Sequence, residues 1–426
     1  MRRRINNILL VALILAESSL ALLHGEEYRS RIPIPDDACE HVGLGIHDVV
    51  ELKDKAWLAN NGRVSTDKGH NWSGPKPFGQ GARGNRLTRL TSGKIVLSSL
   101  ERDPSIWISS DEGDSWTDIS RNFPRMMGGP NCYGGIQELK SGRLMTVCSV
   151  DFNPKFPGHL YEDVQAQGNW NRKPYSVEGH QHLPEIYLSF VVYSDDQGKT
   201  WKMAEGYYGV PLALFGWFDL HGIVNGNNGH WSFGEVSLAE TQSGRLLTFG
   251  RSEVGRIVYT SSVDNGASWN ALLPSELPNS GSPPFLTKIP KTGDLLCVWN
   301  QVSHEEIRRG YRRGRLSTAI SKDGGFSWEN FKTLELSVGM EDTVRIAAEY
   351  PITMVRARQY VGDLPDQFSY FHYPKVAFAA DRVILMYLRG APINGIAEQK
   401  LDEQQNILRV YPLEWFYEQD ETPRTR

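Results

Sequence analysis

Four side chains in the second half of the chain could together bind an anionic molecule. Glu235 stands directly before one predicted strand, and Arg251 ends the strand that follows it. Arg313 precedes a later strand, and Tyr373 opens another. Guanidinium groups bind carboxylates through paired, charge-assisted hydrogen bonds that lysine cannot reproduce. The four residues can act together only if the fold brings their strands to one place.

An eight-residue pattern, Ser-x-Asp-x-Gly-x-x-Trp, occurs five times and indicates what that fold is. The copies are residues 65–72, 109–116, 194–201, 262–269 and 321–328. The Asp can accept hydrogen bonds from backbone N–H groups of a tight turn, and the Gly supplies a backbone conformation that costs other residues energy. The Trp is predicted to pack between neighbouring sheets. Because a catalytic group is rarely needed five times, we interpret the five aspartates as turn-forming residues.

Pairs of apolar strands joined by short turns accompany the boxes. They begin near Val49, Leu87, Ile136, Val236, Phe285 and Val376. Such alternating runs predict β-strands. Six units of about four strands predict an all-β fold, a six-bladed β-propeller. The sixth unit has no box, and its partner strand is predicted at 407–415. The first strand of each blade lines the axis, so residues at strand starts gather over one face.

The N-terminus has the features of a secretory signal. Three arginines at positions 2 to 4 precede an apolar stretch from Ile8 to Ala16, and small residues follow near Ala21. We predict a signal peptide over 1–21, one propeller domain over 28–418, and a secreted or periplasmic protein. An uncleaved anchor is the alternative; after cleavage no membrane association is expected. The oligomeric state does not follow from the sequence.

Composition and cysteine use exclude several functions. The net charge of −4 with interspersed signs gives no case for nucleic-acid binding. No P-loop, Gly-x-Ser-x-Gly elbow or CxxC pair occurs. No metal or cofactor is expected. His159, His180 and His182, in a long insertion, are a weak candidate for a metal site. Cys132 and Cys148 flank one predicted hairpin and either form a disulfide or remain free buried thiols.

The chain resembles the sialidase (neuraminidase) superfamily over nearly all of its length. The five boxes match the Asp-box repeat of that family, which is specific for the fold but shared by proteins of other activity. More discriminating is the order of Glu235, Arg251, Arg313 and the Tyr-Pro pair at Tyr373, which matches the family's site. Arg31-Ile-Pro is similar to the family's Arg-Ile-Pro motif, which supplies the first arginine of the substrate-binding triad.

The resemblance implies a retaining exo-glycosidase that removes terminal sialic acid or a related acidic sugar from a glycan. Tyr373 would be the nucleophile and Glu235 its base, while Arg251, Arg313 and Arg31 would bind the substrate carboxylate. A neutral tyrosine avoids the repulsion that a carboxylate nucleophile would meet from this substrate. Because free tyrosine has a pKa of about 10, it needs a base beside it. The glycan is the expected partner.

Two parts of the family's site have no clear match. The catalytic aspartate of the family lies between Arg-Ile-Pro and the first box, where this chain has almost no loop. Asp48, Asp54 and Asp103 are alternatives for this acid, or the acid is absent. Arg83 or Arg86, near the start of the second unit, could replace the Arg-Ile-Pro arginine.

The same residues also have structural interpretations. Arg251 could pair with Glu253 or another acid, Arg313 lies in a basic run that could simply be solvated, and Tyr373 could belong to ordinary blade packing. Two other functions therefore stay open. One is an exo-glycosidase for another polysaccharide sugar on the same fold, and the other is a non-catalytic glycan-binding propeller.

Overall fold

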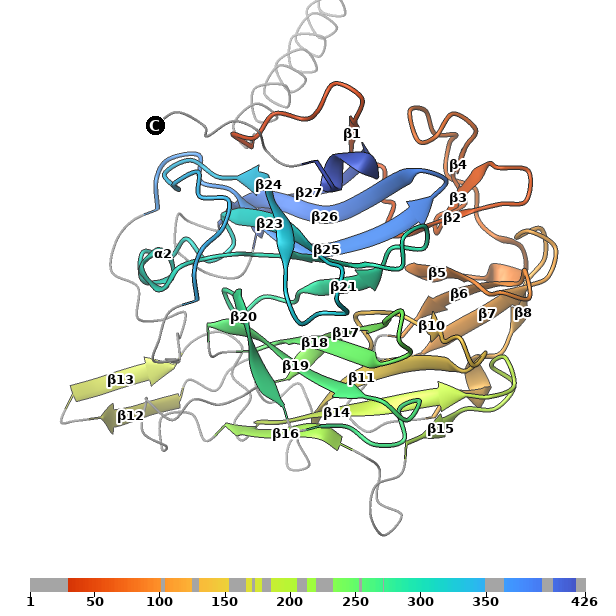
Figure 1. Ribbon diagram of the computed structural model, residues 1–426, viewed down its shortest axis with the longest axis horizontal. Coiled ribbons are helices and arrows are strands. Elements are labelled where there is room, and N and C mark those ends of the chain that lie inside the picture. The colour runs from red at the N-terminus through yellow and green to blue at the C-terminus, as the bar shows by residue number, and fades with distance from the viewer. Residues whose placement is uncertain are drawn as a thin grey trace, which may run out of the picture.

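Six β-sheets follow one another in chain order around a common centre, which makes the chain a six-bladed β-propeller, as the sequence predicts (Figure 1). The computed structural model describes residues 30–100, 104–124, 130–152, 166–170, 173–177, 185–204, 213–219, 233–252, 255–270, 272–348, 364–392 and 401–418. The predicted signal peptide, 1–21, lies outside these ranges. Within them, no helix is both long enough and apolar enough to cross a membrane.

The first three blades differ in size, and blade 1 is the shortest. Blade 1 contains β2 (Val49–Glu51), β3 (Trp57–Ala59) and β4 (Val64–Ser65). Blade 2 contains β5 (Arg86–Arg89), β6 (Ile95–Ser99), β7 (Ser105–Ser109) and β8 (Thr117–Asp118). Blade 3 contains β10 (Gln137–Glu138), β11 (Leu144–Phe152), β14 (Glu185–Ser194) and β15 (Lys202–Met203). It is extended by β9 (Pro130–Asn131) and β16 (Ala213–Asp219), and a separate ribbon pairs β12 (Ala166–Trp170) with β13 (Lys173–Val177).

The last three blades have four strands each. Blade 4 contains β17 (Gly234–Glu240), β18 (Leu246–Arg251), β19 (Arg256–Ser262) and β20 (Leu273–Pro278). Blade 5 contains β21 (Phe285–Lys288), β22 (Leu295–Trp299), β23 (Arg315–Ser321) and β24 (Glu329–Leu336). Blade 6 contains β25 (Tyr370–Ala379), β26 (Arg382–Pro392), β27 (Leu401–Pro412) and β1 (Cys39–Val42). The described helical segments are α2 (His304–Arg308), η1 (Gly79–Gly81), η2 (Ser120–Asn122) and η7 (Glu414–Phe416).

The ring is closed by pairing an early strand with a late one. Strand β1 runs antiparallel to β27, with Cys39 opposite Val410. An ion pair reinforces the closure, since Arg409 Nε lies 2.7 Å from the Glu40 carboxylate. The predicted partner strand of the sixth unit is confirmed, because β27 pairs with β26 over most of its length. The sequence analysis predicts no strand at the position of β1.

The boxes form the tight turns that the sequence predicts. In the first box the Ser65 hydroxyl donates to Asp67 Oδ1 across 2.9 Å. The Gly69 N–H donates to the Ser65 hydroxyl at 2.9 Å. The Asn71 N–H donates to Asp67 Oδ1, also at 2.9 Å. The same three bonds recur in the other four boxes. Hydrogen bonds, mainly from Asn71, lower the pKa of Asp67 to about 2. The aspartates are therefore structural.

The box tryptophans pack between neighbouring blades, which confirms the second half of that prediction. Trp116 of blade 2 lies in one apolar cluster with Val50 and Leu58 of blade 1. Trp328 of blade 5 lies in another with Leu247 of blade 4. Each box thus fixes a turn and joins two sheets at once.

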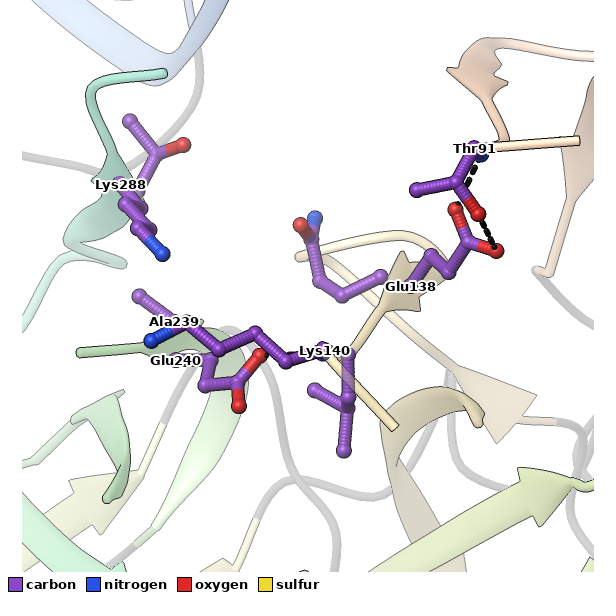
Figure 2. Close-up of a pocket in the computed structure, with 9 residues that line it drawn as sticks. Thr91, Glu138, Lys140, Ala239, Glu240 and Lys288 are labelled. Atoms are coloured by element: carbon purple, nitrogen blue, oxygen red, sulfur yellow. Dashed lines mark hydrogen bonds between the residues drawn. The ribbon is translucent and has the colours of Figure 1, made fainter. Parts of the chain in front are cut away.

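The two faces of the ring carry different groups. Where the hairpins of the inner strands lie, a cavity of about 200 Å³ opens between blades 2 to 5 (Figure 2). Two of its carboxylates brace neighbouring blades: Glu138 accepts the N–H of Thr91 at 2.5 Å, and Glu240 accepts that of Lys140 at 2.6 Å. The candidate site lies at the other ends of the inner strands, where those strands begin.

Candidate active site

Glu235 and Arg251 form an ion pair at the start of blade 4. Arg251 Nη1 donates to Glu235 Oε2 across 2.9 Å, and the two side chains are only 22 % and 15 % exposed. The register of β17 against β18 is irregular between Gly234 and Ser237, and Glu235 has a φ of 46°. Such irregularities at a strand start re-aim a side chain. Here the Glu235 carboxylate is directed to the guanidinium of Arg251, the last residue of the next strand.

Buried hydroxyls of blade 3 hold the backbone of Glu235. The Glu235 N–H donates to Ser149 Oγ at 3.1 Å, and Ser149 Oγ lies 3.1 Å from Ser189 Oγ. Ser189 in turn donates to the carbonyl of Phe233 at 2.5 Å. These serines fix Glu235 from a neighbouring blade. Sequence reasoning missed them, because a serine in a strand gives no signal of the contact that it makes.

Tyr373 has a comparable setting in blade 6. It has a φ of 52°, the pairing of β25 with β26 is irregular between His372 and Lys375, and the side chain is 37 % exposed. The ring of Tyr133 packs 6.3 Å from that of Tyr373, and the Tyr133 hydroxyl donates to the carbonyl of Pro374. Tyr133, which the sequence analysis did not single out, therefore supports the bent backbone that presents Tyr373.

Arg313 lies beside Tyr373 and is 2 % exposed, so the interpretation of its basic run as merely solvated is wrong. Its Nη1 lies 2.6 Å from His372 Nδ1, and its Cζ lies 5.6 Å from the centre of the Tyr373 ring. Burial lowers the pKa of Arg313 to about 10, and the charge of Arg251 acts in the same direction. The guanidinium remains protonated at neutral pH.

The charges of Glu235 and Arg313 both act on the phenol of Tyr133. Burial raises the pKa of Tyr133 well above its usual range, and the charge of Glu235 raises it further. Arg313 opposes that rise. No hydrogen bond joins the Tyr373 phenol to Glu235 within the part of the chain that the structure describes. The carboxylate is instead bound by Arg251.

Arg86 and Asp48 form a second charged pair at the axis. Arg86 is 7 % exposed, and its Nε lies 3.4 Å from Asp48 Oδ2. Arg86 Cζ also lies 5.0 Å from the ring centre of Phe285, a residue of blade 5, so the side chain of this blade 2 residue crosses towards the opposite side. The Asp48 carboxylate accepts the N–H groups of Val49 at 2.9 Å and Leu87 at 3.0 Å. Burial raises the Asp48 pKa, and Arg86 lowers it in part.

The other residues that the sequence offers for this half of the site are placed elsewhere. Arg31 is exposed, and its Nη1 donates to the carbonyl of Met340 at 2.7 Å. Arg83 is exposed as well. Asp54 accepts the N–H of Ala56 at 3.0 Å in the hairpin turn between β2 and β3. Its turn lies on the opposite face from Glu235.

Other predictions concern residues beyond the described ranges. Asp103, Glu253, His159, His180 and His182 all lie outside them. Among the described residues, no group of three or more His, Cys, Asp or Glu side chains is placed to hold a metal ion. Within those ranges the candidate site is thus a set of arginines, tyrosines and two carboxylates.

One family model and several solved structures are similar to this chain. The family model for the BNR repeat-like domain matches residues 91–385. Among solved structures, a protein of unknown function from Dyadobacter fermentans is 14 % identical, with a TM-score of 0.49 over 88 % of this chain and 99 % of its own. The NanB sialidase of Streptococcus pneumoniae is 12 % identical, with a TM-score of 0.36 over 79 % and 71 %. The α-L-arabinofuranosidase Arb93A of Fusarium graminearum is 13 % identical, with a TM-score of 0.40 over 77 % and 92 %. These values support no transfer of activity.

Proposed function

Because this chain belongs to the family of BNR repeat-like proteins, we propose that it is a retaining exo-glycosidase of the sialidase type. Its substrate is a glycan that ends in sialic acid or a related acidic sugar. The main support is Arg313, a buried guanidinium with no carboxylate bonded to it among the described residues, beside the partly exposed ring of Tyr373. A buried charge is costly unless it is paired. A substrate carboxylate would supply the missing partner.

Arg251 and Arg313 bind that carboxylate in the proposal, and Arg86 adds a third guanidinium. Arg86 suits this role better than Arg31, because its Nε and Nη1 are buried without a hydrogen-bond partner among the described residues. Arg31, by contrast, is exposed and already donates to Met340. The role of Arg31 stays a prediction that its contacts do not support.

In the proposed reaction, the Tyr373 oxygen attacks the anomeric carbon while the bond to the leaving oxygen breaks. The phenol proton passes to Glu235, and water later cleaves the glycosyl–tyrosine bond, so the configuration is retained. Without substrate, Arg251 holds the Glu235 carboxylate. A substrate carboxylate competes for Arg251 and so frees Glu235 to accept the Tyr373 proton, because catalytic hydrogen bonds often form only in the complex.

The proposal assigns no acid to the leaving group. Asp48 is a poor candidate, because both of its oxygens accept backbone N–H groups and one also faces Arg86. Asp103 lies outside the described residues. A leaving group that needs no protonation, such as a nitrophenolate, avoids this requirement.

The test is hydrolysis of a chromogenic nitrophenyl sialoside by the purified protein. Tyr373→Phe should lower kcat by about 10²–10⁴, and Tyr259→Phe, a matched change in the outer part of blade 4, should leave it unchanged. No turnover of the sialoside by the unaltered protein would refute the choice of sugar. Uronic acid and rhamnose glycosides in the same assay would then identify another sugar.

A glycan-binding propeller without catalysis is the second candidate. The absence of a Glu235–Tyr373 hydrogen bond among the described residues, and the occupied oxygens of Asp48, favour it. It predicts binding of acidic glycans on an array, loss of that binding in Arg313→Gln, and no hydrolysis of any glycoside in the panel.

We also propose that the protein is secreted or periplasmic. Cys132 and Cys148 are joined in a disulfide, so the alternative of two free thiols is wrong. Disulfides persist mainly in oxidising compartments. N-terminal sequencing of the protein from the culture medium or periplasm tests the location and the predicted cleavage near Ala21 together.

A further inference from the structure

Arg312, next to Arg313 in the chain, is a buried cation that the proposed reaction does not use. It is 3 % exposed, and its Nε donates to the carbonyl of Ser280 across 3.1 Å. Its Nη1 and Nη2 have no hydrogen-bond partner in the described residues. The segment that carries it joins β22 to β23, and the Ser280 segment joins β20 to β21, so both lie where the inner strands begin.

A second donor without a partner is His372, which contacts Arg313, the residue next to Arg312 in the chain. His372 is 2 % exposed, and its Nδ1 accepts from Arg313 Nη1 at 2.6 Å, so the ring proton is on Nε2. That Nε2 has no partner among the described residues. Burial lowers the pKa of His372 well below its usual range, and Arg313, Arg251 and Arg312 lower it further. The imidazole is therefore neutral and offers one N–H group.

Most of the unsatisfied groups in this region are donors, and Asn300 Oδ1 is a buried acceptor without a partner in the described residues. Arg313 Nη2 also lacks a partner in the described residues, while the Tyr370 hydroxyl already donates to the Gly310 carbonyl at 2.8 Å. Nearby Arg315 shows the contrast, because its two Nη atoms lie 2.8 and 3.0 Å from the Glu306 carboxylate. Arg315 has its counter-charge within the fold, whereas Arg312 has none among the described residues.

A buried charge without a partner destabilises a fold, and natural proteins retain such groups at functional sites. We propose that Arg312 and His372 form a second anion subsite beside the Arg251–Arg313 pair. It takes an oxygen-rich anionic substituent, either a second carboxylate or a sulfate ester. That this substituent belongs to a glycan rests on the proposed function, but the anion subsite does not.

The first experiment uses inorganic sulfate as the probe. The Tm of the full-length mature protein is measured in sodium sulfate and in sodium chloride at equal ionic strength. We expect sulfate to raise the Tm by about 2–4 °C over chloride, because a ligand that binds the folded state stabilises it. Arg312→Gln should abolish this rise. Arg309→Gln, an exposed arginine of the same segment, should keep it.

The same variant separates an anion subsite from a purely structural role. In low salt, Arg312→Gln should raise the Tm, because it removes an unpaired buried charge. A lower Tm for Arg312→Gln, or an equal rise with sulfate in both proteins, would overturn the subsite. If Arg312→Gln does not fold, Arg312→Lys serves instead, since it keeps the charge but loses the planar donor pair and should lose most of the sulfate effect.

The second experiment tests the glycan. If the protein hydrolyses sialosides, Arg312→Gln should raise KM at least tenfold for an oligosaccharide with a second carboxylate or with a sulfate ester, but not for a simple nitrophenyl sialoside. The two oligosaccharides tell the two substituents apart. Equal losses for all three substrates would refute the assignment to a second substituent. If nothing is hydrolysed while the sulfate effect depends on Arg312, the subsite stands and the proposed function fails.

Discussion

Arg251 donates a hydrogen bond to Glu235 across 2.9 Å, so the two residues to which the resemblance gives different tasks are bound to each other. One would bind the substrate carboxylate and the other would accept a proton from Tyr373. In the proposed function, a substrate carboxylate competes with Glu235 for the Arg251 guanidinium, which a neutral sugar would not do. The proposal thus links the charge of the substrate to the availability of the base.

Substitutions in this pair should have separable effects. Glu235→Gln should lower kcat by about 10²–10⁴ with little change in KM, since it removes the base and leaves Arg251 in place. Arg251→Gln should mainly raise KM, because it removes one ligand of the substrate carboxylate. Steady-state kinetics on a nitrophenyl sialoside measure both.

Glu240→Gln is the matched control, because Glu240 ends β17, the strand that has Glu235 at its second position, and binds the Lys140 N–H on the opposite face (Figure 2). It should change neither constant. Equal losses of kcat in Glu235→Gln and Arg251→Gln, with KM unchanged in both, would contradict the separate roles.

Asp48 provides the next prediction. It is buried, it accepts two backbone N–H groups, and it lies 3.4 Å from Arg86. Removing one member of a buried ion pair leaves the other charge uncompensated, so Asp48→Asn should lower the free energy of unfolding by about 3–5 kcal/mol. Asp54→Asn, in an exposed turn, should cost under about 1 kcal/mol. Urea unfolding followed by tryptophan fluorescence compares the two variants.

The result also decides the role of Asp48. A variant Asp48→Asn with unchanged stability and no hydrolysis of natural sialosides, but with normal turnover of a nitrophenyl sialoside, would identify Asp48 as the missing acid. That outcome would overturn its assignment here as the support of Arg86.

Local sequence was enough to predict the propeller. The box places a serine, an aspartate and a glycine within five residues, and the bonds of Ser65 and Asp67 lie inside that segment. The hairpins are also formed by residues close together in the sequence, so the alternation of apolar strands and turns predicts the blades. Strand β1 could not be predicted, because Cys39–Val42 is short and gains its partner only from β27 at the other end of the chain.

The site was predictable only in part for the same reason. Glu235 and Arg251 are sixteen positions apart on adjacent strands, so a hairpin joins them. Tyr133 reaches Pro374 and Arg86 reaches Phe285 across the ring, and no local pattern marks such contacts. Arg312 and Arg315 look alike in the sequence. What distinguishes them is whether a carboxylate such as Glu306 meets them in the fold.

The boxes should control stability at low pH. Hydrogen bonds, above all from Ser115, lower the pKa of Asp111 from 3.8 to about 2. A carboxylate whose pKa is lower in the folded state stabilises the fold above its unfolded pKa and loses this contribution as the pH falls through the folded value. The Tm should therefore fall between about pH 4 and pH 2. In Asp111→Asn the deficit in Tm should be full above pH 4 and shrink towards pH 2.

The control for this experiment is Asp114→Asn, which changes an exposed carboxylate of the same box. At every pH, any decrease in Tm caused by Asp114→Asn should be smaller than the decrease that Asp111→Asn causes above pH 4. A deficit of Asp111→Asn that stays constant from pH 7 to pH 2 would show that the box depends on the shape of the side chain and not on its charge.

The disulfide gives the last prediction. Cys132 and Cys148 close a loop of sixteen positions next to the apolar cluster between blades 2 and 3. Closing a loop of this size restricts the unfolded chain and stabilises a protein by about 3 kcal/mol. Replacing both cysteines by serine should therefore lower the free energy of unfolding by about 2–4 kcal/mol, as urea denaturation would measure.

A reducing agent should destabilise the parent protein by a similar amount and leave the double variant unchanged. Cys39→Ser, which alters a thiol outside the disulfide, should respond to the reducing agent as the parent does. An equal response of the double variant to reduction would show that another thiol reaction causes the loss.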